Sequence, residues 1–377
     1  MEYRNFFLRT GLVVAIILLL SIVACPVMAL AEWKTVTVDM TSADVGQHNS
    51  LVIDPAGNPH ISYYDDANKQ IRYATTIDGI WTPEPVADSK GTHTTSLALD
   101  PEGNPAISYG DGDHNGMLMY THRSGGWITE TVADKSRIGD LGYHSSLVID
   151  SAGTPHISYN NGKGEYDTML MYATKNGTGW TSVTPDPKIL GYDSSMVLDA
   201  SGLPHIAFRN GMDSGYIAYA SEDSSGKWDT NMVANRDGKG GDMAKDAGCD
   251  MSLALDSAGN PHIAYYNELR KELMYSSWDG KEWVTEIVDQ EGETGWHPSL
   301  AMYHDQPSIS YHDISKDELR LATKDLNTGK WAFSTVDKDK VGSDSSLAFD
   351  SSGHPRIAYY DERHKALKYA SMEEIKI

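Results

Sequence analysis

Cysteine is nearly absent from this chain of 377 residues, which contains only Cys25 and Cys249. Cys25 falls in an apolar N-terminal segment, so the remainder holds one cysteine and cannot form an intramolecular disulfide. The fold must therefore be stabilised by its hydrophobic core, and about 345 residues are enough to bury a large one.

Basic residues are also scarce, since 31 Lys and Arg stand against 53 Asp and Glu, for a formal net charge of −22. Phosphate backbones and anionic lipid surfaces both bind to basic faces. The charge therefore argues against a nucleic-acid partner and against docking on anionic lipid. It suits an acidic, soluble protein that meets neutral ligands or cations.

The apolar run that stands out lies at the N-terminus, where Arg4 and Arg9 precede LVVAIILLLSIVAC and Ala29-Leu30-Ala31 offers a small-x-small cleavage site. This layout predicts a secretory signal peptide over residues 1–31. Two alternatives stay open: a lipobox at Ile22–Cys25 with a lipid anchor on Cys25, and an uncleaved membrane anchor. All three place residues 32–377 outside the cytoplasm, secreted or attached to the cell surface, with no membrane insertion of the mature domain.

The rest of the chain is built from seven copies of one pattern. The copies begin at Ser50, Ser96, Ser146, Ser195, Ser252, Ser299 and Ser346, with spacings of 46, 50, 49, 57, 47 and 47 residues. Each copy predicts four short strands, represented in the first copy by SLVID, PHISYY, IRYAT and a strand that begins with Trp81. This period is typical of propeller blades. No segment shows a convincing helical period, except for the last few residues.

The seventh copy ends after its third strand, whereas Trp33–Asp39 precedes the first copy and reads like a tryptophan strand. A ring that is closed by this N-terminal strand leaves no open sheet edge. We therefore predict an all-β fold, a single seven-bladed β-propeller with four-stranded blades over residues 32–377, in which Trp33–Asp39 completes the last blade.

Two positions of the second strand recur in a way that indicates architecture. The position of Tyr63 holds Tyr or Phe in all seven copies, next to a Ser or Ala, as face-to-face blade packing requires. The histidine of "NPHI" recurs as His60, His156, His205 and His262. It follows the Asp54–Gly57 turn. Four separate blades cannot bring these histidines together unless the position lines the axis, so we interpret them as structural.

The pattern D-x-x-G-x-P-H-I-x-Y, then L-x-Y-A, then G-x-W resembles secreted propellers grouped with BNR and sialidase-like sequences, and also NHL repeats. The resemblance covers residues 33–371 and implies the architecture rather than an activity. Sialidase activity is not supported, because the chain has no Asp-box, no arginine triad and no F-R-I-P motif.

Propellers of this kind bind ligands on the face that carries the loops between blades and those between the second and third strands. By this resemblance, a ring near the central channel is expected from His48, Thr94, His144, Asp193, Asp250, His297 and Asp344. A second ring follows the second strands: Asp65, Asp111, Asn161, Asn210, Asn267, Asp313 and Asp361. The first ring could hold a cation or perform acid–base chemistry. The alternative is that the two rings hydrogen-bond each blade together, as in WD-repeat propellers.

A ligand site should break the sevenfold symmetry. Aromatic, imidazole and arginine side chains do so beside the two rings, and aromatic platforms with polar neighbours suit sugar rings. The candidate ligand-binding residues are therefore His48, Tyr64, Tyr143, His144, Tyr192, Arg209, Tyr266, Trp296, His297, His312 and Tyr360. The alternative is ordinary loop packing.

The fourth copy carries an insertion, Asn235–Asp250, with aspartates at 237, 242, 246 and 250. These could ligate calcium, but their spacing matches no EF-hand loop, and a solvated glycine-rich loop is the simpler interpretation. We expect no other cofactor and no metal site.

Three functions remain open at this point. The first is a monomeric binding module for a glycan or another cell-surface ligand. The second is a polysaccharide lyase or glycoside hydrolase, with His48, His144 or His297 as the base, Tyr64, Tyr143 or Tyr192 as the acid, and Arg209 against a uronate. The third is a non-catalytic scaffold that binds other proteins.

Overall fold

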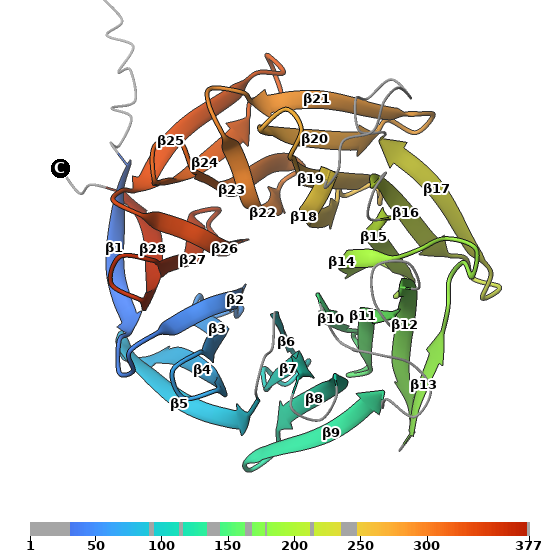
Figure 1. Ribbon diagram of the computed structural model, residues 1–377, viewed down its shortest axis with the longest axis horizontal. Coiled ribbons are helices and arrows are strands. Elements are labelled where there is room, and N and C mark those ends of the chain that lie inside the picture. Colours follow the sequence, from blue (N-terminus) through green and yellow to red (C-terminus); the bar gives the residue numbers. More distant parts are fainter. Residues whose placement is uncertain are drawn as a thin grey trace, which may run out of the picture.

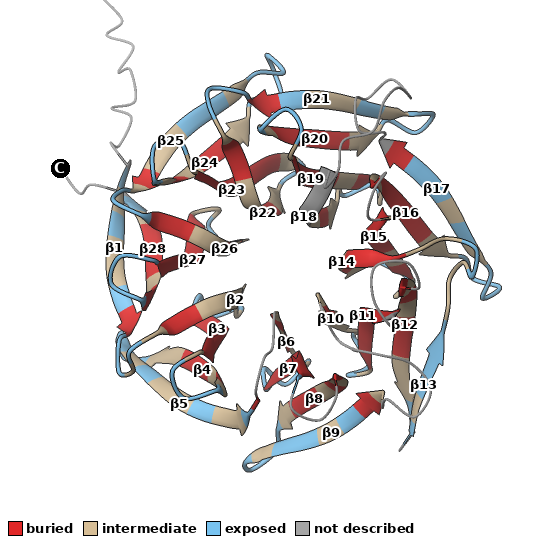
Figure 2. Cartoon of the chain, viewed as in Figure 1, coloured by how far each residue is buried: buried red, intermediate tan, exposed pale blue. Residues whose placement is uncertain are grey.

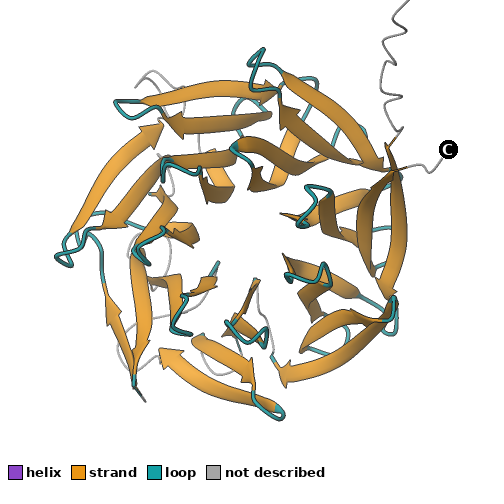
Figure 3. Ribbon diagram, turned by 180° about the vertical axis from the view of Figure 1, so that it is seen from behind, coloured by secondary structure: helices purple, strands orange, loops and turns teal. Residues whose placement is uncertain are grey.

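The computed structural model is a closed ring of seven four-stranded antiparallel sheets around a central channel (Figure 1). It describes residues 31–89, 94–112, 116–133, 144–162, 168–177, 179–211, 215–234 and 247–374. Figure 3, which shows the ring from behind, contains strands and loops but no helix in this part of the chain. Accordingly, no described helix is long and apolar enough to cross a membrane. The predicted seven-bladed fold is confirmed.

The blades follow one another along the chain, and each runs from an innermost to an outermost strand. Blade 1 comprises β2 (Val45–Ile53), β3 (Pro59–Asp65), β4 (Gln70–Ile77) and β5 (Ile80–Asp88), and blade 2 comprises β6 (Thr95–Leu99), β7 (Pro105–Asp111), β8 (Met117–Arg123) and β9 (Trp127–Ala133). Blade 3 comprises β10 (Ser146–Ile149), β11 (Pro155–Gly162), β12 (Thr168–Asn176) and β13 (Gly179–Val183), and blade 4 comprises β14 (Tyr192–Leu198), β15 (Pro204–Asn210), β16 (Tyr216–Glu222) and β17 (Trp228–Ala234). Blade 5 comprises β18 (Ala247–Leu255), β19 (Pro261–Asn267), β20 (Glu272–Trp278) and β21 (Trp283–Asp289), and blade 6 comprises β22 (Thr294–Tyr303), β23 (Gln306–Asp313), β24 (Glu318–Lys324) and β25 (Trp331–Asp337).

Blade 7 joins the two ends of the chain. It comprises β26 (Val341–Phe349), β27 (Pro355–Asp361), β28 (Ala366–Glu374) and, as its outermost strand, β1 (Ala31–Asp39). The register of β1 against β28 runs from Ala31 opposite Glu374 to Asp39 opposite Leu367. The predicted closure by the N-terminal strand is therefore confirmed.

The core lies between neighbouring blades, and the second strands form its centre. β3 and β7 are buried along their whole length, whereas the outermost strands alternate with exposed positions (Figure 2). The recurrent ring of the second strand is buried in every blade, at Tyr63, Tyr109, Tyr159, Phe208, Tyr265, Tyr311 and Tyr359. Its prediction as core packing is confirmed.

Three of these tyrosines also donate a hydrogen bond to an aspartate, which packing alone does not predict. The Tyr63 hydroxyl donates to Asp39 at 2.7 Å, and Tyr311 and Tyr359 donate to Asp289 and Asp337, both at 2.6 Å. Each of these aspartates ends an outermost strand. The hydroxyl is thereby satisfied in the core, as a buried polar group must be.

The tryptophans of the outermost strands hold adjacent blades together. Six of the seven pack edge-on against a tyrosine in the third strand of the preceding blade, with centroids 5.2–5.5 Å apart, in the pairs Trp81–Tyr369, Trp127–Tyr73, Trp180–Tyr120, Trp228–Tyr172, Trp283–Tyr219 and Trp331–Tyr275. Such edge-to-face pairs stabilise a packed interface beyond their burial.

The serine that opens every copy recurs because its hydroxyl joins one blade to the next. Its hydroxyl oxygen accepts the backbone N–H of the following blade's inner strand, as when Ser50 accepts Leu97 at 3.1 Å. The same bond recurs around the ring from Ser96, Ser146, Ser195, Ser252, Ser299 and Ser346, at 2.9–3.0 Å. The inner strands of different blades belong to different sheets, so these backbone N–H groups have no acceptor within a β-ladder. The ring of serine hydroxyls, called here the serine circuit, supplies their acceptors.

The "NPHI" histidines lie at the opposite end of the strands and are structural, as predicted. The Nδ1 atom of each shares a hydrogen bond with a tyrosine hydroxyl of the adjacent strand, and its Nε2 lies 3.4–3.7 Å from the aspartate of the preceding turn. Burial lowers the pKa of His60, His156, His205 and His262 and outweighs the opposing aspartates.

These histidines predict an acid-sensitive fold. Their folded pKa is below the unfolded value of about 6.5, so the unfolded chain binds more protons as the pH falls through that value, and stability present above it is lost. We expect the midpoint of thermal unfolding to fall between about pH 7.5 and 5.5. The variant His205→Ala, which copies Ala106 of blade 2, should show a smaller fall in circular-dichroism melts. An equal fall in both proteins would contradict the assignment.

Candidate functional site

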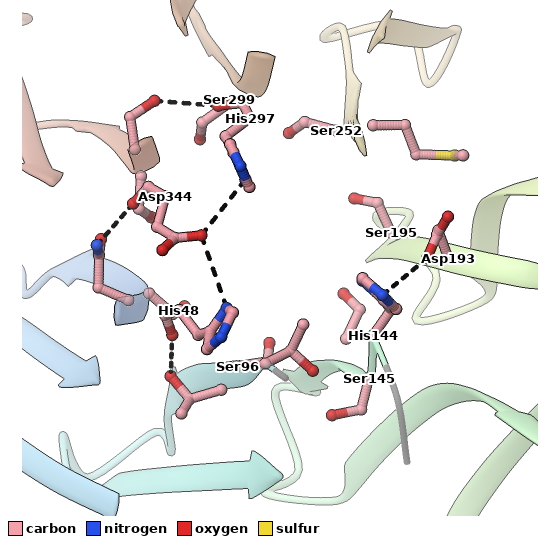
Figure 4. A pocket seen from close by; sticks show the side chains of 18 of the residues that line it. His48, Ser96, His144, Ser145, Asp193, Ser195, Ser252, His297, Ser299 and Asp344 are labelled. Carbon is pink, nitrogen blue, oxygen red and sulfur yellow. Dashed lines mark hydrogen bonds and ion pairs between the residues drawn. The ribbon is translucent and has the colours of Figure 1, made fainter. Parts of the chain in front are cut away.

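A cavity of about 350 Å³ opens at the end of the central channel where the inner strands begin (Figure 4). All seven blades contribute to its lining, which consists of residues 48–50, 94–96, 144–146, 193–195, 251–252, 297–299 and 344–346. Hydroxyl groups, imidazoles and carboxylates dominate this set. The structure therefore brings together at one cavity the described part of the His/Asp ring that the sequence predicts, apart from the fifth copy.

A β-bulge in the inner strand places the ring residue in blades 1, 4, 6 and 7. In blade 1, Gln47 pairs with Tyr64 and Ser50 pairs with Ser62, so the inner strand holds one extra residue. The ring residues adopt a left-handed backbone, with φ of 51° at His48, 52° at His144, 32° at Asp193, 49° at His297 and 52° at Asp344. His and Asp are among the few residue types that tolerate this conformation, which costs on the order of 1–3 kcal/mol when the surroundings enforce it.

A glycine two residues before the ring position makes the bulge feasible. A Cβ atom at Gly46, Gly191, Gly295 or Gly342 would lie 2.4–2.9 Å from atoms of a leucine in the preceding blade. Three of these glycines also have φ above 100°. The pattern Gly-x-His/Asp is visible in six copies of the sequence, so this part of the site carried a signal that the sequence analysis did not use.

Two histidines converge on one buried carboxylate in the cavity. The Nδ1 atoms of His48 and His297 lie 3.6 and 3.3 Å from Oδ1 of Asp344, whose side chain is 13 % exposed. Figure 4 shows both imidazoles pointing toward it from the neighbouring blades. Burial alone would raise the pKa of Asp344, but His297 and His48 outweigh it and lower this pKa. The carboxylate is therefore held ionised between two proton-binding groups.

His144 belongs to a second polar group on the other side of the cavity. Its Nε2 lies 3.0 Å from Oδ1 of Asp193, while Nε of Arg209 lies 3.4 Å from the other oxygen of the same carboxylate. The Arg209 guanidinium also lies over the ring of Tyr192, 5.3 Å from its centroid. Because Asp193 and Arg209 are buried and the His144 side chain is 38 % exposed, the imidazole is the part of this group that a ligand can reach.

The other candidate residues lie behind the cavity rather than in its lining. Tyr64, Tyr192, Arg209, Tyr266, His312 and Tyr360 are all buried, and Trp296 is half-buried against Tyr266. The Tyr64, Tyr266 and Tyr360 hydroxyls donate to Ser89, Glu293 and Asp44. The aromatic mouth expected from the sequence is thus not formed by these side chains. Tyr143 lies outside the described residues, and ligand binding by any of the candidates stays a prediction.

Side chains of the second predicted ring accept hydrogen bonds from the loops that follow them. Asp65, Asn267, Asp313 and Asp361 each accept the backbone N–H of the residue three positions later. Three contacts of the His/Asp ring join its own members, and Asp193 also contacts Arg209. The WD-type pairing of the two rings stays a prediction.

The calcium hypothesis cannot be placed on the structure, because Asp237, Asp242 and Asp246 lie outside the described residues and the side chain of Asp250 is not described. Within the described residues, no three His, Cys, Asp or Glu side chains form a group that could hold a metal ion.

Comparison with known proteins yields structural neighbours only. No protein-family model matches the chain, and no curated protein matches it. An ulvan lyase, described as a new family of polysaccharide lyase, matches with a TM-score of 0.62 and 16% identity over 89% of this chain and 95% of its own. The Aleuria aurantia lectin in complex with Fucα1-6GlcNAc matches with a TM-score of 0.53 and 12% identity, over 88% and 96%. A Hadza microbial sialidase matches with a TM-score of 0.52 and 11% identity, over 82% and 74%.

These likenesses establish the fold alone. Propellers with sequences this different carry unrelated sites on the same scaffold. The resemblance to BNR or NHL repeats stays a prediction, and the function has to be argued from the cavity.

Proposed function

We propose that this protein is a secreted or surface-attached monomeric binding module that takes a sugar unit of a glycan into the central cavity. One observation carries the proposal: the cavity is lined from every blade by hydroxyl and imidazole groups. These groups both donate and accept hydrogen bonds, as sugar hydroxyls do. The volume of about 350 Å³ also falls within the range of about 300–1,000 Å³ that is usual for small-ligand sites.

The polar lining sets how such a ligand would be recognised. Because Tyr64, Tyr192, Tyr266 and Tyr360 are buried and none of the described aromatic candidates lines the cavity, recognition depends on hydrogen bonds to the lining rather than on stacking. The His48–Asp344–His297 group offers the densest set of donors and acceptors. Similar solved structures include a lectin that was crystallised with a fucosylated sugar, which is consistent with this reading.

The test is a glycan array, followed by calorimetry on the strongest ligand. His297→Ala is expected to weaken binding at least tenfold, because it removes a cavity imidazole and releases Asp344. The matched control is His364→Ala, an exposed histidine on a loop outside the cavity lining. An array with no ligand, or equal affinities for both variants, would favour the scaffold function.

A second candidate function is a polysaccharide lyase, and the His144–Asp193 pair favours it. A partly exposed imidazole that is oriented by a buried carboxylate has the arrangement of a general base. In β-elimination it would take the proton beside the uronate carboxyl group while the glycosidic oxygen leaves, which forms a C=C bond. Arg209 is buried against Asp193, so here it positions that carboxylate.

The lyase function predicts new ultraviolet absorbance from an unsaturated uronate when the protein is mixed with ulvan or another acidic polysaccharide. His144→Gln should reduce the initial rate by at least about 100-fold, the usual contribution of a general base. If the wild-type protein produces no such absorbance with any acidic polysaccharide, the lyase activity is excluded and the binding function stands.

A further inference from the structure

Three of the junctions between blades carry an ion pair beside their Trp–Tyr pair. At three junctions a cation at the end of a third strand meets a glutamate of the preceding blade: Arg123 with Glu84 at 2.8 Å, Lys175 with Glu130 at 2.7 Å and Lys324 with Glu286 at 2.5 Å. The indoles of Trp180 and Trp331 donate to two of these glutamates. The ion pair thus lies beside the indole at these junctions.

The junction between blades 4 and 5 replaces both charges at once. Each of the three cations pairs in register with the tryptophan of its own hairpin, and in blade 5 the residue paired with Trp283 is Trp278. Each glutamate stands three residues after a blade tryptophan, and three residues after Trp228 the chain has Asn231. Where those three junctions have an ion pair, the junction of blades 4 and 5 has an indole and an amide.

A groove of about 250 Å³ opens at this junction, and we call it the blade 4–5 groove. It is lined by Trp278, Trp283, Tyr219, Asn231 and the turn 259–261. The two indoles are half-buried, and their rings lie 5.8 Å apart at 66°. The turn 259–261 and the β20–β21 hairpin both lie at the ends of the strands opposite to the central cavity.

The chemistry of this groove differs from that of its counterpart at the junction of blades 2 and 3. That counterpart measures about 170 Å³ and includes Lys175, Asp100 and His122. The lining of the blade 4–5 groove contains no charged side chain. Asn231 and Asn260 each donate from the amide nitrogen to a neighbouring aspartate at 2.9 Å. One such bond orients an amide and uses only part of its donor and acceptor capacity.

We propose that the blade 4–5 groove binds one neutral sugar residue of a glycan chain. The C–H face of the ring packs on an indole, and its hydroxyls bond to the amides of Asn231 and Asn260. The absence of a cation in the groove lining and the net charge of −22 both disfavour an anionic sugar. The β-hairpins of the other blades form without a second tryptophan, so Trp278 is not required for the turn. The site goes beyond the proposed function, because it stands whether or not the central cavity binds a ligand.

The experiment follows the indole N–H signals of the nine tryptophans in 15N-labelled protein of residues 32–377. The probes are cellohexaose, laminarihexaose, mannohexaose and xylohexaose, each titrated to about 10 mM, which detects millimolar affinity. The signals of Trp278 and Trp283, assigned from Trp→Phe variants, should move with at least one probe. Movement of neither signal with any of the four probes overturns the proposal.

Matched variants separate binding from folding. Trp278→Lys combined with Asn231→Glu installs the ion pair that three other junctions carry, so this protein should fold and bind the probe at least tenfold more weakly. Trp278→Phe keeps an aromatic face and should bind within about threefold of the parent, a difference well below 1 kcal/mol. His297→Ala, in the central cavity, should leave the titration unchanged. An unchanged affinity in the double variant, with its thermal midpoint intact, overturns the site.

Discussion

Deleting residues 1–40 is expected to abolish cooperative folding of the ring. The deletion removes β1, whose backbone pairs with β28 along nearly its whole length. It also removes Val38 from the core cluster shared by blades 7 and 1, and Asp39, the acceptor for the buried Tyr63 hydroxyl. β28 becomes an open edge, which is a template for aggregation. Size-exclusion chromatography and thermal melts should show aggregated or unfolded protein.

The control is a deletion of residues 1–30 only, which keeps β1 and should melt cooperatively. A synthetic peptide of residues 31–41, added in excess during refolding of the shorter protein, should restore the monomer peak because it supplies the missing strand. If the protein that begins at residue 41 melts at the same temperature as the control, β1 does not close the ring.

Replacing Asp289 by Ala is expected to cost about 3–5 kcal/mol of unfolding free energy, the usual penalty for breaking a buried ion pair by removing one partner. The Asp289 carboxylate accepts from the Tyr311 hydroxyl at 2.6 Å and from Arg320 at 2.7 Å, and its side chain is 3% exposed. The variant leaves a buried hydroxyl without its acceptor, and Arg320 retains Asp313 at 3.4 Å. Urea denaturation at neutral pH measures the loss.

Two comparisons make this prediction specific. Asp279→Ala removes an aspartate from the exposed hairpin turn of the same blade, where it accepts two backbone N–H groups, and should cost far less. Tyr311→Phe removes only the hydroxyl and should cost an intermediate amount. Equal losses for Asp279→Ala and Asp289→Ala would mean that the buried contact does not stabilise the ring.

The architecture could be predicted from the sequence because each element is specified locally and then repeated seven times. Alternating apolar positions, the Asp-to-Gly turn and the recurrent Trp define four strands in each copy, and the surplus Trp33 strand accounts for the missing one. The contacts between blades could not be predicted in the same way. Nothing local shows that the hydroxyl of Tyr311 reaches Asp289, because the partner belongs to the preceding blade.

The candidate site was likewise predictable where it depends on local sequence and not where it depends on contacts between blades. His48, His144 and His297 were predicted at the channel from their place before the serine, and the cavity lining includes them. Tyr64 and Tyr266 were predicted at a mouth from their place at the end of a strand, yet they are buried, because a neighbouring blade covers the face they point to. In the sequence, Trp278 is one of two tryptophans that do not begin a predicted strand. Its neighbourhood with Asn231, 47 residues earlier, required the structure.

The bulge at the start of the inner strand in blades 1, 4, 6 and 7 has a consequence for how such a protein diversifies. Its backbone is held by the preceding glycine and the serine circuit, neither of which involves the side chain at the ring position. The ring positions of these blades therefore behave as interchangeable positions for residues that tolerate a left-handed backbone, and in this chain they are filled by His, Asp, His and Asp. A duplicated blade brings a new ring position together with the glycine and serine that hold its backbone. Single substitutions can then rewrite the chemistry of the opening while the ring keeps its fold.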